Sequence, residues 1–175
     1  AIRTIDPKKP IIVTAFDKSQ PEGFDYMTPI ELPNIIYQAH MYKPMGFTHQ
    51  FSHDDAGTTP SEPSVTYPGR IRGKWENKES LCRHLKPVRD FQLAYNVPIY
   101  VGEFSAPRWA PGAETWLNDV ISIFEEYGWD WSYNAYRASP IWNLELTENK
   151  YRVDKAARPT ARLEVLKKWW AKNER

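Results

Sequence analysis

Four short runs of apolar residues have the length of buried strands. They span residues 10–15, 34–41, 98–103 and 129–134. The first three are nearly continuous in Ile, Val and Tyr and do not alternate strictly with polar residues, which is typical of parallel strands covered on both faces. The pattern therefore predicts strands of one parallel sheet.

Amphipathic helices are predicted after three of these runs. Residues 78–95 repeat apolar side chains at helical spacing, and Pro87 is expected to bend this helix. Residues 113–127 repeat apolar side chains in the same way, and Gly128 stands where a helix would end. Thr160 is the expected N-cap of a last helix, which carries two tryptophans near the C-terminus.

The predicted elements follow the order strand, loop, strand, helix, strand, helix, strand, helix. This alternation predicts an α/β fold with a parallel sheet and right-handed crossovers. Long irregular stretches (16–33, 43–77 and 135–159) follow three of the strands at their carboxyl ends. An α/β barrel builds its site from loops at this end of its strands. No repeat, low-complexity tract or linker divides the chain, so we predict a single domain over residues 1–175.

Composition narrows the range of partners. The chain has 23 basic and 22 acidic residues, which gives no electrostatic case for binding nucleic acid or an anionic membrane. No apolar run approaches membrane-spanning length, and a single Cys82 cannot form an internal disulfide. The first residues lack the basic-then-apolar pattern of a signal peptide, which leaves the compartment open. Aromatic residues make up 14%, which suits a protein that presents rings to a flat ligand, although large cores also collect tryptophan.

The sharpest local feature is an apolar strand that ends in a carboxylate, at Val101-Gly102-Glu103. Gly102 permits close approach of another chain segment beside the carboxylate. A carboxylate at the carboxyl end of a parallel strand points into the usual site crevice. The alternative is a strand-end glutamate that meets water or caps the next helix, and spacing alone does not decide between the two.

A histidine and a phenol share one face at the end of the preceding strand. Alternation along a strand places His40 and Tyr42 on the same side. Together they can hydrogen-bond a carboxylate and a sugar hydroxyl, although such a pair alone is more often a satisfied buried polar contact. Because Glu103 ends the next predicted strand, the functional interpretation gains weight.

Histidines and acidic residues also gather in a predicted loop, at His49, His53, Asp54 and Asp55. Two histidines four residues apart suit zinc when they lie on a helix. Glycine and proline residues mark this stretch as a loop, so we predict that it borders a substrate cleft and binds no metal. No cofactor is predicted for the chain.

Three segments resemble, in the right order, the last strands of glycoside hydrolase family 5, the cellulase and mannanase family. Residues 34–50, with His40-Met41-Tyr42 and Thr48-His49-Gln50, resemble its sixth strand. Residues 98–104 resemble its seventh strand, and residues 129–145 its eighth strand and the segment after it. The resemblance implies half of a (β/α)8 TIM barrel, equivalent to strands five to eight.

The resemblance also implies a function, a retaining β-glycosidase of the β-glucosidase or cellulase type that acts on a β-linked oligosaccharide or glucoside. Glu103 corresponds to the nucleophile of the family, and His40 and Tyr42 are expected to support it. Family members commonly present an aromatic ring to the sugar from the eighth strand, and Asn134 stands at that position. The expected substrate-binding residues are Asn134, Tyr136, Trp142, His49 and Trp131.

One departure from the family affects the chemistry. Its general acid/base is a glutamate that follows an asparagine at the end of the fourth strand, whereas the single Asn-Glu pair here is Asn173-Glu174, in the C-terminal tail. A retaining enzyme needs two carboxyl groups about 5–5.5 Å apart. The chain is therefore interpreted either as an enzyme, or as a non-catalytic remnant or truncated fragment that binds carbohydrate or only associates.

Geometry suggests a source for the second carboxyl group. Four parallel strands leave two open edges and a second sheet face, which we expect to be apolar and uncovered. Two copies related by a two-fold axis can close into an eight-stranded barrel, so we predict a homodimer or a larger even-numbered assembly. Glu145 of the second copy is then the candidate acid/base, the alternative being that Glu145 forms an ordinary ion pair.

Overall fold

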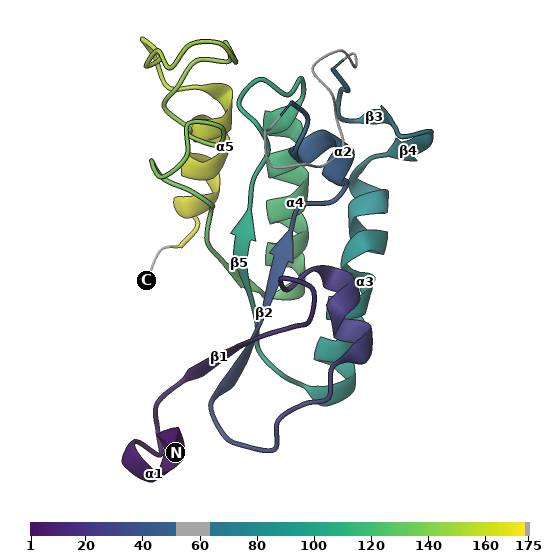
Figure 1. Ribbon diagram of the computed structural model, residues 1–175, viewed down its shortest axis with the longest axis vertical. Coiled ribbons are helices and arrows are strands. Elements are labelled where there is room, and N and C mark those ends of the chain that lie inside the picture. Colours follow the sequence, from purple (N-terminus) through teal and green to yellow (C-terminus); the bar gives the residue numbers. More distant parts are fainter. Residues whose placement is uncertain (52–63, 174–175) are drawn as a thin grey trace.

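The computed structural model describes residues 1–51 and 64–173. Its main sheet has the strand order β1-β2-β5-β6, and every pair of neighbouring strands is parallel. Its strands are β1 (Ile11–Thr14), β2 (Ile35–Met41), β5 (Ile99–Phe104) and β6 (Asp130–Trp131) (Figure 1). The predicted parallel sheet is confirmed, and its carboxyl ends all lie at the same edge.

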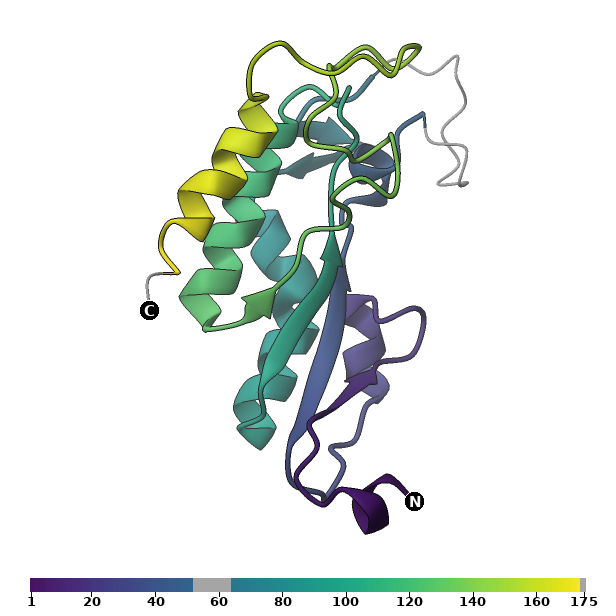
Figure 2. The same cartoon turned by 90° about the vertical axis from the view of Figure 1, so that its left-hand side faces the viewer.

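Three long helices lie on one side of this sheet (Figure 2). They are α3 (Lys78–Tyr95), α4 (Ala113–Tyr127) and α5 (Ala161–Trp170), close to the predicted bounds. Asn77 caps α3 by accepting a hydrogen bond from the Ser80 backbone N–H. As predicted, Thr160 caps α5 and Gly128, in the left-handed conformation, ends α4.

The core fills the space between the sheet and these helices. Along β2, Ile35, Tyr37, Ala39 and Met41 alternate as buried side chains on the helix side. Trp116 of α4 is fully buried and donates from its indole nitrogen to the Lys43 carbonyl, 3.0 Å away. Burying one large apolar side chain contributes about 1.5–3 kcal/mol, so this layer fixes the positions of the strand ends.

The opposite face of the sheet is polar toward the carboxyl ends of the strands, whereas Ile12 and Ile36 lie on it toward the amino ends, so the expectation of an apolar face holds only in part. Gln38 and His40 of β2 and Tyr100 of β5 are half-buried residues between the buried positions of their strands. The Tyr100 and Ser132 hydroxyls are hydrogen-bonded at 2.7 Å. The near-continuous apolar runs predicted burial on both faces, but polar residues occupy the later of the alternate positions that turn away from the helices.

Within the described residues, the two outer strands of the sheet each pair on one side only. β6 is shorter than predicted, because its ladder with β5 covers two residues. Beyond it the chain continues along β5, where the Asn134 backbone N–H donates to the Phe104 carbonyl. At the other edge, Ile12 is 52% and Phe16 77% exposed. Both edges therefore keep unpaired backbone groups.

Short elements precede the first strand and occupy two of the stretches predicted to be irregular, 16–33 and 43–77. They are α1 (Ile2–Ile5), the 3-10 helix η1 (Pro21–Tyr26), α2 (Met45–Thr48) and the hairpin of β3 (Gly69–Ile71) and β4 (Lys74–Glu76). η1 packs on α3, with the Phe24 and Phe91 rings 5.4 Å apart. Among the described residues, no helix has the length and apolarity required to cross a bilayer.

Candidate active site

A cavity of about 390 Å³ opens at the carboxyl ends of the central strands. Its walls come from four separate parts of the chain: the turn after β1, β2 with the residues that follow it, the end of β5, and the segment after β6. The lining residues are Lys18, Gln20, His40, Tyr42, Met45, His49, Glu103, Asn134 and Trp142. The cavity thus brings together six of the predicted site residues.

Glu103 lies at the end of β5 with its side chain 43% exposed. The Tyr42 hydroxyl donates to Glu103 Oε2 at 3.2 Å, and the Asn134 amide nitrogen donates to the same oxygen at 3.2 Å. His40 Nδ1 is 3.9 Å from that oxygen. Glu103 is therefore a carboxylate oriented by neighbouring groups at the strand end, and not a helix cap.

Tyr42 and Asn134 also bind each other. The Asn134 amide nitrogen donates to the Tyr42 hydroxyl at 2.7 Å. Burial, above all, raises the pKa of Tyr42 well above its ordinary value, and the negative charge of Glu103 raises it further. Tyr42 therefore keeps its proton and remains a hydrogen-bond donor to the carboxylate.

Aromatic rings form one wall of the cavity. The Tyr42 ring lies 5.1 Å from the His49 ring and 5.9 Å from the Trp142 ring, measured between centroids. The Tyr133 hydroxyl donates to the Trp142 backbone carbonyl, and burial raises the pKa of Tyr133 to about 12. Because Tyr133 stays protonated, this bond holds Trp142 beside the cavity.

The segment that carries Trp142 is anchored by two buried cations. Arg162 donates to the backbone carbonyls of Asn143 and Leu146. The other cation is Arg108, which is 3% exposed. Its guanidinium donates to the backbone carbonyls of Pro140 at 2.9 Å and of Arg152 at 2.8 Å. It also donates to the carbonyls of Thr147 and Asn149. The two side chains thus gather residues 140–152 over the carboxyl ends of the strands.

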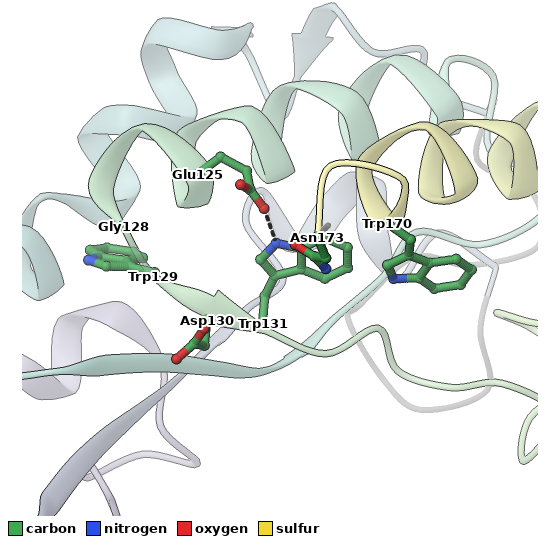
Figure 3. Close-up of a pocket in the computed structure, with 7 residues that line it drawn as sticks. All are labelled: Glu125, Gly128, Trp129, Asp130, Trp131, Trp170 and Asn173. Carbon is green, nitrogen blue, oxygen red and sulfur yellow. Dashed lines mark hydrogen bonds between the residues drawn. The ribbon is translucent and has the colours of Figure 1, made fainter. Parts of the chain in front are cut away.

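Trp131 lies away from this cavity, which corrects its predicted substrate-binding role. Its indole nitrogen donates to Glu125 at 2.7 Å in a cleft between α4, α5 and β6 that Trp129 and Trp170 also line (Figure 3). In the sheet Trp131 is the partner of Val101, which is fully buried on the helix side. Because paired residues share a face, Trp131 also turns toward the helices.

Two further predicted residues lie outside the cavity. Tyr136 is 68% exposed, and the Arg137 guanidinium lies 4.7 Å from its ring. Arg137 also binds both carboxylate oxygens of Glu145, at 2.6 and 3.0 Å. That contact, above all, lowers the pKa of Glu145, the opposite of what a general acid needs. Within the chain, Glu145 forms the ion pair foreseen as its alternative role.

Sequence reasoning missed Lys18 and Gln20, which line the cavity from the turn after β1. Asp17, Lys18 and Ser19 all have positive φ angles and form a left-handed turn. Glycine is the usual sequence signal for such a turn, and none of these residues is a glycine. The Ser19 carbonyl accepts from the His40 backbone N–H at 2.7 Å, which ties this turn to β2. Lys18 thereby adds a cation to the cavity wall.

The predicted loop cluster lies mostly beyond the described residues. His53, Asp54 and Asp55 fall outside them, whereas His49 lines the cavity. Within residues 1–51 and 64–173, no group of three or more His, Cys, Asp or Glu side chains is arranged to hold a metal ion.

Comparisons with known proteins give a family match and several relatives that the chain matches over part of their length. The family model described as Cellulase (glycosyl hydrolase family 5) matches residues 1–139. Endoglucanase C of Acetivibrio thermocellus is 29% identical over 157 residues, which cover 76% of this chain and 46% of that protein. Endoglucanase 3 of Fibrobacter succinogenes is 28% identical over 189 residues, which cover 89% of this chain and 28% of that protein.

Solved structures show the same relation. A hyperthermophilic endo-beta-1,4-glucanase in complex with substrate matches with a TM-score of 0.72 and 26% identity, covering 93% of this chain and 50% of that one. For an endoglucanase of Thermotoga maritima the TM-score is 0.73 at 24% identity, covering 94% and 50%. The chain thus spans about half the length of these proteins, and its parallel strands and helices form half of a (β/α)8 barrel, as predicted.

Proposed function

The chain belongs to the cellulase family, glycosyl hydrolase family 5, and on this premise we propose that it hydrolyses β-linked glucan by a retaining mechanism with Glu103 as the nucleophile. One observation carries the proposal: Glu103 is oriented by Tyr42 and Asn134 at the strand end, inside a cavity of about 390 Å³. Cavities at this edge of an α/β barrel are its usual catalytic sites.

The hydrogen bonds distinguish the two carboxylate oxygens of Glu103. Tyr42 and Asn134 both donate to Oε2, so we assign Oε1 to attack the anomeric carbon. A glycosyl ester of Glu103 forms as the bond to the leaving oxygen breaks, and water then hydrolyses this ester. Both donors orient the carboxylate before attack and bind it again after hydrolysis.

Substrate contacts follow from the cavity walls. The Trp142 ring offers an apolar face to the sugar ring, while His49 offers a polar ring edge to its hydroxyl groups. Asn134 already binds Glu103 and Tyr42 through its amide nitrogen, so its amide oxygen is the atom that remains to meet a sugar hydroxyl. We propose β-1,4-linked glucose units because relatives at 26–29% identity are named endoglucanases or an endo-beta-1,4-glucanase.

Removal of one hydroxyl tests this arrangement. Tyr42→Phe should slow hydrolysis of an aryl β-cellobioside by about tenfold to a hundredfold, because one hydrogen bond to the carboxylate is lost. The far-ultraviolet circular dichroism spectrum should not change, since the ring itself remains. Tyr26→Phe is the matched control, because Tyr26 is 83% exposed on η1. An unchanged rate in Tyr42→Phe would contradict the supporting role.

The leaving group needs a proton from a second carboxyl group about 5–5.5 Å from the nucleophile. Among the described residues that line the cavity, Glu103 is the single carboxylate. We therefore propose that the site is completed by a second unit of parallel strands, paired to the open edges of β1 and β6. The exposed Ile12 and Phe16 at the β1 edge support such an interface.

A second copy of the chain is the occupant that we propose for these edges. Sedimentation velocity at micromolar concentration should then give a dimer or a larger even-numbered species. Ile12→Lys should shift this species toward monomer, because the lysine charge resists burial at the new strand pair. Lys8→Glu, in the exposed segment before β1, is the control for a change of charge alone. A soluble monomer of the unmodified chain would exclude self-closure.

The alternative function is binding of glucan without hydrolysis. The lack of a second carboxylate on the described cavity wall favours it. Isothermal titration with cellotetraose distinguishes the two: binding without release of glucose or cellobiose, by any assembly of the chain, would support the binding function.

A further inference from the structure

Gln38 and His40 form a polar pair beside the cavity, on the face of the sheet that turns away from the helices. Gln38 and His40 are two residues apart in β2, so their side chains share a face. The Gln38 amide nitrogen is 2.7 Å from His40 Nε2. An amide nitrogen only donates, so the ring nitrogen that it reaches must accept. In a neutral imidazole the proton then belongs to Nδ1.

Gln38 can occupy this place because the neighbouring strand has a glycine there. A Cβ atom added at Gly102 would lie 2.6 Å from Gln38 Cδ, 2.8 Å from its Oε1 and 2.9 Å from its Nε2. Such distances are far below van der Waals contact, so any larger residue at this position displaces the amide. The ladder between β2 and β5 also shifts register between Ala39 and His40, next to this contact.

The other ring nitrogen faces the carboxylate. His40 Nδ1 lies 3.9 Å from Glu103 Oε2. With the proton on Nδ1, the nitrogen at this distance carries an N–H group, whose positive end attracts the carboxylate oxygen. With the proton on Nε2, a nitrogen lone pair would face the carboxylate instead and repel it.

We infer that Gln38 is a positioning residue: seated against Gly102, it holds His40 as the Nδ1–H tautomer and so directs an N–H toward Glu103. Gln38 does not line the cavity, and it acts on the carboxylate through His40. The inference rests on the proposed function only in treating Glu103 as the nucleophile, because the tautomer of His40 is itself measurable.

Long-range nitrogen–proton correlation spectra of the nitrogen-labelled chain, recorded at about pH 8.5 where free imidazole is neutral, report which ring nitrogen carries the proton. His40→Asn identifies the His40 signals. In the unmodified chain we expect the proton on Nδ1. In Gln38→Glu the new carboxylate can only accept, so Nε2 of His40 should become protonated. The signals of His84, which pairs with Glu76 at 3.2 Å, should stay in place.

Gly102→Ala provides a second, independent variant. It leaves Gln38 in the chain, but the added methyl group displaces the Gln38 amide from its position beside residue 102. The signal of the Nδ1–H tautomer of His40 should therefore weaken or disappear. The Nε2–H tautomer of His40 in the unmodified chain would overturn the inference, as would an unprotonated Nε2 in folded Gln38→Glu. These spectra measure no hydrolysis. If the chain proved inactive, the assigned tautomer of His40 would still stand, and if the tautomer proved different, the proposed hydrolysis would still stand.

Discussion

Glu103→Gln should lose at least about a thousandfold in the hydrolysis of an activated aryl β-cellobioside, the scale of loss seen when a nucleophile is removed. The amide keeps the size of the side chain and one acceptor oxygen for Tyr42 and Asn134, but it is a very poor nucleophile. An activated leaving group is chosen because it depends little on a general acid, which normally contributes about 10²–10⁴-fold. The fold should be retained, because Glu103 lies outside the buried core.

Covalent labelling sharpens this prediction. A dinitrophenyl cellobioside with fluorine on the second carbon of the reacting sugar should leave a stable glycosyl ester, which retaining chemistry forms on the nucleophile. Peptide mapping by mass spectrometry should place the label on Glu103 in the unmodified chain and find none in Glu103→Gln. Glu164→Gln is the matched control, because Glu164 pairs with Lys167 on the outer helix α5. A label on any other residue would falsify the assignment of the nucleophile.

The second large effect is expected at Arg108, in the stability of the fold. Arg108→Met keeps much of the apolar stem but removes the donors for the carbonyls of Pro140, Thr147, Asn149 and Arg152. Hydrogen bonds from a charged group contribute about 1.5–3 kcal/mol each, and the freed carbonyls recover part of this from water. The free energy of unfolding should therefore fall by about 3 kcal/mol, measured by denaturant titration.

The loop should also lose its position over the cavity. In Arg108→Met, binding of cellotetraose should weaken even under conditions where the chain is fully folded, because Trp142 is carried by the released segment. Arg152→Met is the control within the same segment. Its side chain is 69% exposed and pairs with Asp154, so the expected change is within about 0.5 kcal/mol. Equal losses in both variants would contradict the anchoring role of Arg108.

Much of the fold was predictable because hydrophobic periodicity reports burial directly. The helices at 78–95 and 113–127 and the cap at Thr160 follow from local signals that the tertiary structure did not override. The length of β6 was not predictable. An outer strand ends where its hydrogen bonds to the neighbouring strand end, and no residue of its own sequence marks that position. The polar face of the sheet was visible in Gln38 and His40 but was outweighed by the apolar residues between them.

The site was only partly predictable. Glu103, His40 and Tyr42 stand at strand ends, so the topology alone brings them together. Trp131 lies outside the cavity because its pairing with Val101 turns it toward the helices, and the sequence does not show this pairing. Lys18 reaches the cavity through a left-handed turn of non-glycine residues, a conformation that tertiary contacts impose.

Arg108 holds residues 140–152 entirely through main-chain carbonyls. Every amino acid presents that carbonyl, so the anchor is indifferent to which side chains the segment carries. The side chains of the segment can accordingly change while its backbone keeps the same path past the cavity. Randomising the exposed positions around Trp142, with Arg108 left intact, is thus a direct route to chains of altered sugar preference.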